Sequence, residues 1–164
     1  MTEAVAGIEL SPDLKKTLAF DAPEEARNLN HPYIGTGHLL LGLTRLESPA
    51  GPILHAFGLS RGEVWYAVRS TIGRGEILVS GNSELTPLAK TTLDLAIAEA
   101  QRLGYPEVTG LHLLFSLVQK RQGFVEGVLE YMKVNPDKLQ QAVELALWCP
   151  KGDSNSHAIS STDF

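Results

Sequence analysis

The sequence has few of the features that mark disulfide-rich, nucleic-acid-binding or membrane proteins. It contains one cysteine, Cys149, which excludes an internal disulfide and a cysteine-pair metal site and fits a reducing compartment. The net charge of −5 is spread along the chain without a lysine or arginine run, so a nucleic-acid footprint is absent. No apolar run approaches the roughly 20 residues of a membrane helix, and residues 1–10 lack the basic and apolar regions of a secretory signal. We therefore expect a cytoplasmic protein that binds neither nucleic acid nor membrane.

The sequence is rich in the hydrophobic periodicity of helices. With 43% hydrophobic and 20% charged residues, its 164 residues suffice for one buried domain or two small ones that share a core. Ser11 and Pro12 predict a helix start, because the hydroxyl accepts a first-turn amide and proline tolerates the first position. Pro23 is predicted to kink or divide this helix. Its apolar stripe consists of Leu14, Leu18, Ala22, Ala26 and Leu29.

One stretch of the chain occurs twice. Residues 24–43 read EEARNLNHPYIGTGHLLLGL, and residues 99–117 read EAQRLGYPEVTGLHLLFSL. Both contain a Glu-Ala pair, a leucine three residues on, a proline and a His-Leu-Leu run. Such internal similarity indicates a tandem repeat.

The spacing between the two copies changes along the chain. Thr86 follows Ser11 by 75 positions, whereas His112 follows His38 by 74. The first repeat therefore carries one extra residue, which we place near Pro23. The spacing returns to 75 later in the repeats.

The pattern predicts an all-α fold of eight helices, arranged as two pseudo-symmetric four-helix repeats packed as one bundle, with no committed strand. Thr36 is predicted to cap the second helix, and Asn30 and Gly58 to stop the helices before them. The predicted organisation is a lead-in over residues 1–9, repeats over 10–72 and 85–150, a linker over 73–84, and a disordered tail over 151–164.

The repeated loop, together with residues 58–75 and 85–105, resembles the amino-terminal domain of the Clp and Hsp100 ATPases, that of ClpC most closely. The resemblance covers about residues 10–147 and implies a double Clp N motif. No glycine is followed by lysine, so the phosphate-binding G-x-x-x-x-G-K-[ST] loop of an ATPase module is missing. The chain is thus similar to stand-alone Clp N-domain proteins of actinobacteria and to chloroplast ClpT, which attend a Clp machine.

The resemblance implies a protein that is not an enzyme and needs no cofactor. It would bind a peptide, degron, adaptor or small-molecule ligand in the groove between repeats and modulate a ClpC–ClpP protease. Alternatively, it would dock on the Clp assembly as a structural accessory subunit and stabilise it. The implied partners are ClpC, ClpP, their adaptors and substrates, and cyclic peptide antibiotics.

The resemblance also implies ligand-binding residues. Each ClpC repeat holds a pocket for phosphorylated arginine, made by the hydroxyl residue that caps the first helix and by a loop glutamate. Ser11 and Thr86 match the hydroxyls, but Gly37 and Leu111 replace the glutamates, which removes the carboxylate that pairs with a guanidinium. Backbone amides at the helix N-termini can still attract an anion. Alternatively, Ser11, Thr36, Thr86 and Thr109 are helix caps that need no ligand. The candidate ligand-binding residues are Leu10, Ser11, Thr36, Gly37, Leu85, Thr86, Thr109, Gly110 and Leu111.

Two apolar pairs are further candidates. Leu10 and Leu85 precede the two caps and would flank the groove between repeats, in place of the phenylalanine common in ClpC. Trp65 and Tyr66 lie beside the core stripe of their helix. They would form a partner-facing patch or cover the seam between repeats.

The matching histidines, His38 and His112, raise the question of a metal site. A metal generally needs three or four ligands, and the nearest acidic residues, Glu25 and Glu99, provide one per repeat. We therefore predict no metal. Each histidine is expected to pack with a ring nitrogen bonded to a backbone carbonyl of its own loop.

A hydrolytic triad of Ser11, His38 and Asp13 can also be drawn. The sequence has neither a nucleophile elbow nor an oxyanion signature. We therefore predict no catalytic residues.

Overall fold

The computed structural model describes most of the two repeats. The predicted tail and Cys149 lie outside the described residues, as do nearly all of the predicted linker and five residues of the predicted lead-in. The described residues are 4–5, 8–45, 48–72, 84–120 and 124–148.

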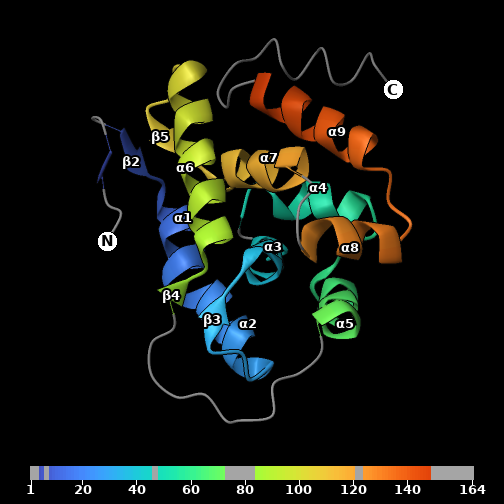
Figure 1. Ribbon diagram of the computed structural model, residues 1–164. Coiled ribbons are helices and arrows are strands. Elements are labelled where there is room, and N and C mark those ends of the chain that lie inside the picture. The colour runs from blue at the N-terminus through green and yellow to red at the C-terminus, as the bar shows by residue number, and fades with distance from the viewer. Residues whose placement is uncertain (1–3, 6–7, 46–47, 73–83, 121–123, 149–164) are drawn as a thin grey trace.

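Helices dominate the described chain, as predicted (Figure 1). A continuous first helix is followed by three more, and the second repeat also has four, so eight helical segments lie in the described residues. In the first repeat these are α1 (Pro12–Lys16) with the π-helical turn η1 (Thr17–Asp21) and α2 (Ala22–Asn28), then α3 (Thr36–Leu43), α4 (Gly51–Ala56) and α5 (Arg61–Ile72). In the second they are α6 (Pro87–Arg102), α7 (Gly110–Lys120), α8 (Phe124–Tyr131) and α9 (Pro136–Trp148).

The predicted helix starts and stops are largely confirmed. The Ser11 hydroxyl accepts the Leu14 amide at 3.2 Å, and the Thr86 hydroxyl accepts the Ala89 amide at 3.1 Å. Asn30 and Gly58 have φ values of 58° and 79°, the left-handed conformation that ends a helix.

The turn η1 accounts for the extra residue of the first repeat. A π-helical turn holds one more residue than an α-helical turn. It lies immediately before α2, whose first turn contains Pro23. The backbone stays helical across this join, so the predicted division of the helix at Pro23 is wrong. The matching helix α6 is regular over its whole length of 16 residues.

Five short strands also lie in the described residues, where the sequence committed to none. They are β1 (Ala4–Val5), β2 (Ile8–Leu10), β3 (Tyr33–Ile34), β4 (Glu84–Leu85) and β5 (Glu107–Val108). Two- and three-residue strands are too short to show an alternating pattern in a sequence. Strand β1 pairs with β2 in antiparallel orientation.

The remaining strand pairs connect the two repeats. Strand β2, just before α1, pairs in parallel with β5 in the loop of the second repeat. Strand β4, just before α6, pairs in parallel with β3 in the loop of the first repeat. The segment that leads into each repeat is therefore attached to the loop of the other.

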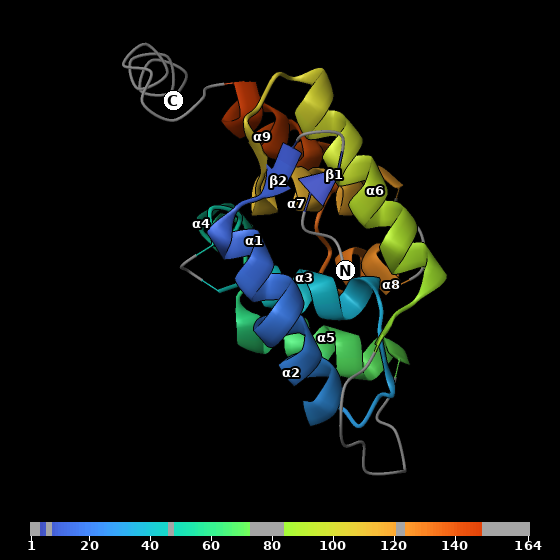
Figure 2. The ribbon, with the colours of Figure 1, turned by 90° about the vertical axis from the view of Figure 1, so that its left-hand side faces the viewer.

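The helix α3 lies at the centre of the molecule, with α1, α2, α5, α6, α7 and α8 around it (Figures 1 and 2). Each of its eight residues is buried, which explains why leucines cover more than one face of this segment. In the part of the chain that the structure describes, no helix has the length and apolar character needed to cross a membrane.

Candidate functional site

The two hydroxyl caps are each placed against the loop of the opposite repeat. The Ser11 amide donates to the Val108 carbonyl at 2.8 Å, which sets the start of α1 beside the start of α7. The Thr86 amide donates to the Ile34 carbonyl at 3.0 Å, which sets the start of α6 beside the start of α3. The candidate residues thus form two junctions, and each junction is built from both repeats. The resemblance had implied a pocket within each repeat.

The Ser11 junction has polar contacts that its counterpart at Thr86 lacks. The Ser11 hydroxyl donates to Asp13 Oδ1 at 2.7 Å, and Asp13 Oδ2 accepts the Gly110 amide at 3.3 Å. Asp13 therefore joins α1 to α7. The position that corresponds to Asp13 in the second repeat is Leu88, which has no polar group.

The two loops are capped by different residues. In the second repeat Thr109 precedes α7, and its hydroxyl accepts the Leu111 amide at 3.2 Å. In the first repeat the residue in that position is Gly35, which is the N-cap of α3 and has no side chain. The prediction that Thr36 is the N-cap is wrong by one residue, because Thr36 is the first residue of the helix itself.

The two positions at which the resemblance implies a lost glutamate, Gly37 and Leu111, differ in their exposure. Gly37 is buried in the first turn of α3. Leu111 is half-buried and packs against the hydrophobic core. Neither position presents a carboxylate to the junction beside it.

The structure does not bring Leu10 and Leu85 together. Leu10 is buried in β2, and Leu85 is half-buried in β4. Figure 1 places β2 beside the C-terminal end of α6 and β4 at its N-terminal end. Each leucine therefore belongs to its own junction.

Both loop histidines accept an amide hydrogen, which corrects the prediction that they bond a carbonyl. His38 Nδ1 accepts from the Gly35 amide, and His112 Nδ1 accepts from the Thr109 amide, both at 2.9 Å. Because Nδ1 is the acceptor, the proton of each neutral ring lies on Nε2. The histidine thus performs the role that glutamate has in a capping box.

The second ring nitrogens of these histidines have different surroundings. His38 Nε2 lies 2.8 Å from Nδ1 of His31, which stacks on Tyr33. In the second repeat Tyr105 replaces His31 and packs against the His112 ring at 4.4 Å. Within the described residues, His112 Nε2 has no hydrogen-bond partner.

Burial keeps both histidines neutral. Burial, with a smaller contribution from the neighbouring His31, lowers the pKa of His38 from 6.5 to about 4. Burial also lowers the pKa of His112 to about 4, against smaller opposing effects of Glu99 and Asp13. In the described part of the chain, no three His, Cys, Asp or Glu side chains are placed to hold a metal ion.

The drawn triad is not assembled. The Ser11 hydroxyl donates to Asp13, whereas the two ring nitrogens of His38 face Gly35 and His31. Ser11 lies beside the start of α7, whereas His38 lies in α3. His38 is therefore not placed to accept the Ser11 proton.

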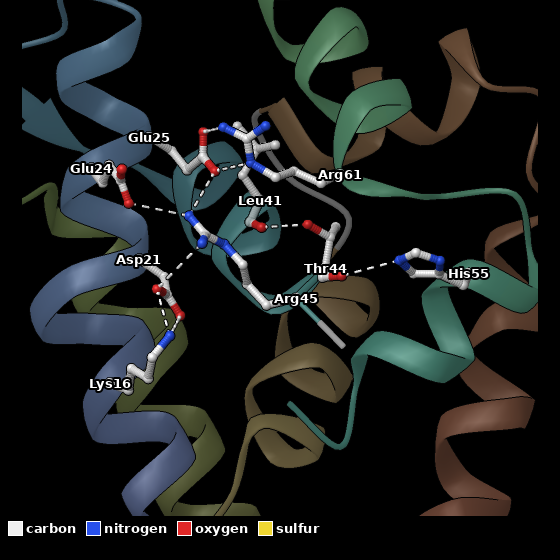
Figure 3. A network of polar contacts seen from close by, with 9 residues as sticks. All are labelled: Lys16, Asp21, Glu24, Glu25, Leu41, Thr44, Arg45, His55 and Arg61. Atoms are coloured by element: carbon white, nitrogen blue, oxygen red, sulfur yellow. Dashed lines mark hydrogen bonds and ion pairs between the residues drawn. The ribbon is translucent and has the colours of Figure 1, made fainter. Parts of the chain in front are cut away.

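A buried ion network was not predicted from the sequence (Figure 3). None of the Glu25 side chain is exposed, and Arg61 binds it through two bonds of 2.6 and 3.0 Å. Arg45 binds the same carboxylate at 3.3 Å and also contacts Glu24 and Asp21. The network joins α2 to the start of α5 and to the segment after α3. The one sequence signal that could have predicted this network is the position of Glu25, directly beside Ala26 of the apolar stripe.

Among the described residues, the second repeat has no matching network. Glu99, which corresponds to Glu25, is half-buried and pairs with Arg102 of its own helix at 2.6 Å. The loop between α6 and α7 is attached to α9 in another way, because the Tyr105 hydroxyl donates to the Leu147 carbonyl at 2.6 Å.

Trp65 and Tyr66 lie on the outward side of α5. Trp65 is half-buried against the core with the Arg69 guanidinium 5.7 Å from its ring, while Tyr66 is 61% exposed. Of these two aromatics, Tyr66 is the one available to a partner.

Comparison with known proteins gives concordant matches. The model of the Clp repeat (R) N-terminal domain matches residues 9–104 and 84–162. The "Negative regulator of genetic competence ClpC/MecB" of Bacillus subtilis is 39% identical over 130 residues, which are 79% of this chain and 16% of that protein. The chain therefore spans about one sixth of the length of this relative.

Solved structures show the same fold. The N-terminal domain of ClpD from Arabidopsis thaliana has a TM-score of 0.72 and 18% identity, over 88% of this chain and 97% of that chain. A ClpV N-domain in complex with a VipB peptide has a TM-score of 0.62 and 19% identity, over 84% of this chain and 86% of that chain.

Proposed function

Because the chain belongs to the Clp repeat N-terminal domain family, we propose that it is a non-enzymatic binding module of a Clp system. It takes up a peptide, degron, adaptor or small-molecule ligand, cyclic peptide antibiotics included, and modulates a ClpC–ClpP protease in the cytoplasm. In this proposal the chain supplies no ATPase activity.

The observation that carries the proposal is the pair of junctions between repeats. Each places a hydroxyl-capped helix start against the loop of the other repeat, beside the start of the helix that follows that loop. The histidines at these junctions are buried and neutral, which suits a binding scaffold better than proton transfer. The peptide bound to the similarly folded ClpV N-domain supports a peptide as ligand.

The direct test is the degradation of a model substrate by purified ClpC and ClpP with the chain added. We expect the degradation rate to change in a saturable way. Leu85→Asp, at the Thr86 junction, should weaken the effect, whereas Leu145→Asp, on the exposed face of α9, is the matched control. An unchanged degradation rate at every concentration of the chain would contradict the proposal.

The ligand chemistry depends on the missing carboxylates. Without an acidic group, neither position 37 nor position 111 can form the bidentate pair that selects a guanidinium. We expect free phosphoarginine to bind the parent chain weakly and the Gly37→Glu, Leu111→Glu double variant more tightly in a calorimetric titration. Tight binding by the parent would show that another group recognises the guanidinium.

The alternative function is a structural accessory subunit that docks on the Clp assembly and stabilises it. It is favoured by large apolar side chains that remain on the surface: Trp148 is 76% exposed and Tyr66 61%. Under this alternative, Trp148→Ser or Tyr66→Ser should abolish co-sedimentation with ClpC–ClpP, and Leu85→Asp should not. The opposite pattern would favour the binding module.

A further inference from the structure

Two histidines of the first repeat are joined to the backbone by a series of hydrogen bonds. The Gly35 amide donates to His38 Nδ1 at 2.9 Å, and His38 Nε2 lies 2.8 Å from His31 Nδ1. Because a backbone amide only donates, the proton of the neutral His38 ring lies on Nε2 and is donated to His31. The His31 ring stacks on Tyr33, with the ring centroids 5.5 Å apart. Donors and acceptors are thus matched along this series of bonds while both rings are neutral.

This series of bonds cannot take up another proton. A protonated histidine donates from both ring nitrogens. On His38 the added hydrogen would face the Gly35 amide hydrogen, and on His31 it would face the hydrogen on His38 Nε2. A move of that hydrogen to His38 Nδ1 would again place it against the Gly35 amide. His31 and Gly35 lie on either side of β3, so each possible protonation breaks a bond between α3 and one end of β3.

The other ionisable groups nearby do not compensate for such a proton. Burial lowers the pKa of His38 to about 4, and in the described part of the chain His31 is the one charged side chain that adds to this effect. On the paired strands, Tyr33 stacks on His31 and Glu84 is exposed. On α2 and α6, which pack against these strands and against α3, the ionisable side chains are exposed or are bonded to one another or to arginines: Glu24, Glu25, Arg27, Lys90, Asp94, Glu99 and Arg102.

Strand β3 supports the start of α6. It pairs in parallel with β4, and the Ile34 carbonyl accepts the Thr86 amide at 3.0 Å. Thr86 is also the cap of α6, since its hydroxyl accepts the Ala89 amide. A displacement of β3 from α3 therefore removes the bonds that hold β4 and the first turn of α6 in the Thr86 junction.

The second repeat has an acceptor for the corresponding proton. His112 Nδ1 also accepts a loop amide, that of Thr109, but it lies 3.0 Å from the Thr109 hydroxyl oxygen as well. A hydroxyl oxygen has two lone pairs, so it can accept from a protonated His112 while it accepts the Leu111 amide. Tyr105 replaces His31 and packs against the His112 ring. The loop at the Ser11 junction therefore keeps its position when His112 takes up a proton.

We propose that the His31–His38 pair is a pH-responsive element, which opens the Thr86 junction when it takes up a proton while the Ser11 junction stays closed. Acid then separates one strand pair of the two that join the repeats, at a pH at which the helices are still folded. The difference between the junctions follows from one residue, because Gly35 has no hydroxyl where Thr109 has one. This inference does not depend on the proposed binding function.

The test is amide hydrogen exchange of the full ¹⁵N-labelled chain at pH 7 and pH 5, with each rate expressed as a protection factor so that the intrinsic effect of pH cancels. Release of His38 returns its pKa from about 4 to 6.5, so opening becomes more favourable as the pH falls below 6.5. We expect the protection of the Thr86 amide to fall roughly 20-fold, the effect of one released histidine. The Ser11 amide should keep its protection, and the circular dichroism should be unchanged. Equal falls at both amides, or none at Thr86, would overturn the proposal.

A substitution at position 35 tests the role of the missing hydroxyl. A Cβ there would lie 3.9 Å from its nearest neighbours, and the backbone φ is −101°, so threonine fits without strain. Gly35→Thr should supply the acceptor and remove the acid sensitivity of the Thr86 amide. Gly35→Ala is the matched control, because it adds the Cβ without the hydroxyl and should leave the sensitivity in place. Equal acid sensitivity of the two variants would contradict the assignment of the hydroxyl.

The reciprocal variant is Thr109→Gly, which removes the acceptor beside His112. It should make the Ser11 amide acid-sensitive in the way that the Thr86 amide is in the parent chain. Thr109 also caps α7, so a loss of protection that is the same at pH 7 and pH 5 measures the cap, and the additional fall at pH 5 measures the acceptor. The absence of an additional fall would show that the Thr109 hydroxyl does not accept the proton. Where this variant fails to fold, the comparison of Gly35→Thr with Gly35→Ala decides.

Discussion

At the scale of single residues, the Glu25 carboxylate carries a charge with no exposed surface, and Arg61 provides two of its bonds. Removal of one partner from a buried ion pair leaves a charge without compensation. We expect Arg61→Ala to lower the free energy of unfolding by about 2 to 3 kcal/mol, since Arg45 still contacts the carboxylate and Arg61 is itself 44% exposed.

The second repeat provides the control for this variant. Arg102 makes an equally short bond to Glu99, but on the exposed surface of one helix, so Arg102→Ala should change stability little. Urea denaturation of both variants measures the difference. Equal losses in the two would show that burial of Glu25 has no energetic consequence.

The two loop histidines predict a pH dependence of stability. Their pKa values fall from 6.5 to about 4 on folding, so between these pH values the unfolded chain binds protons that the folded chain does not. Stability should therefore be complete above pH 6.5 and decrease as the pH falls toward 4, by about 2 to 3 kcal/mol for each histidine. Denaturation midpoints measured from pH 4 to 7 check this. His38→Gln and His112→Gln should each flatten the slope, and an unchanged slope in both would contradict the assignment.

At the scale of elements, η1 is a one-residue insertion that the first helix tolerates. It has a local consequence for packing, because a Cβ on Gly42 of α3 would lie 2.9 Å from the Thr17 methyl group. The matching residue is Ser116, a buried residue of α7, and α7 packs against the regular helix α6. The close approach of α3 to the π-helical turn therefore requires glycine where the second repeat has a side chain.

Deletion of Ala19 should convert η1 into a regular helical turn. The residues on both sides would then have the spacing of α6, so we expect a folded protein that loses less than about 2 kcal/mol of stability. Deletion of Asp94 from α6 is the control. It rotates Ala96, Ile97 and Ala100 away from the core by about 100° and should abolish cooperative unfolding. Circular dichroism and thermal unfolding distinguish the two, and a Δ19 protein as damaged as Δ94 would show that η1 is required.

The sequence predicted the elements well because their signals are local. Helix starts at Ser11 and Thr86 and stops at Asn30 and Gly58 depend on residues within one turn, and all are confirmed. Other features depend on packing between distant segments. The bond between Asp13 and the Gly110 amide joins residues 97 positions apart, and neither periodicity nor spacing encodes it. The resemblance supplied the family, but the contacts that distinguish the two junctions came from the structure.

At the scale of the whole molecule, the repeats are connected so that neither is complete alone. Each repeat provides one strand to each of the two parallel pairs that join them, and α3 packs against α6, α7 and α8 of the second repeat. Its buried leucines would face water in an isolated first repeat. A half of this size buries a smaller fraction of its unfolded surface than the whole chain does, so it has little stability to spare for this loss.

We therefore predict that residues 8–72 and residues 84–148, produced separately, lack a cooperative thermal transition, while the full chain unfolds in a single one. Circular dichroism of each fragment checks the first part, and coincident transitions followed by fluorescence and circular dichroism check the second. When the fragments are mixed, the strand pairs and the α3 contacts can form between chains, so a cooperative transition should return. A cooperative transition in either isolated fragment would mean that the repeats are independent domains, and each junction would then be a surface between domains.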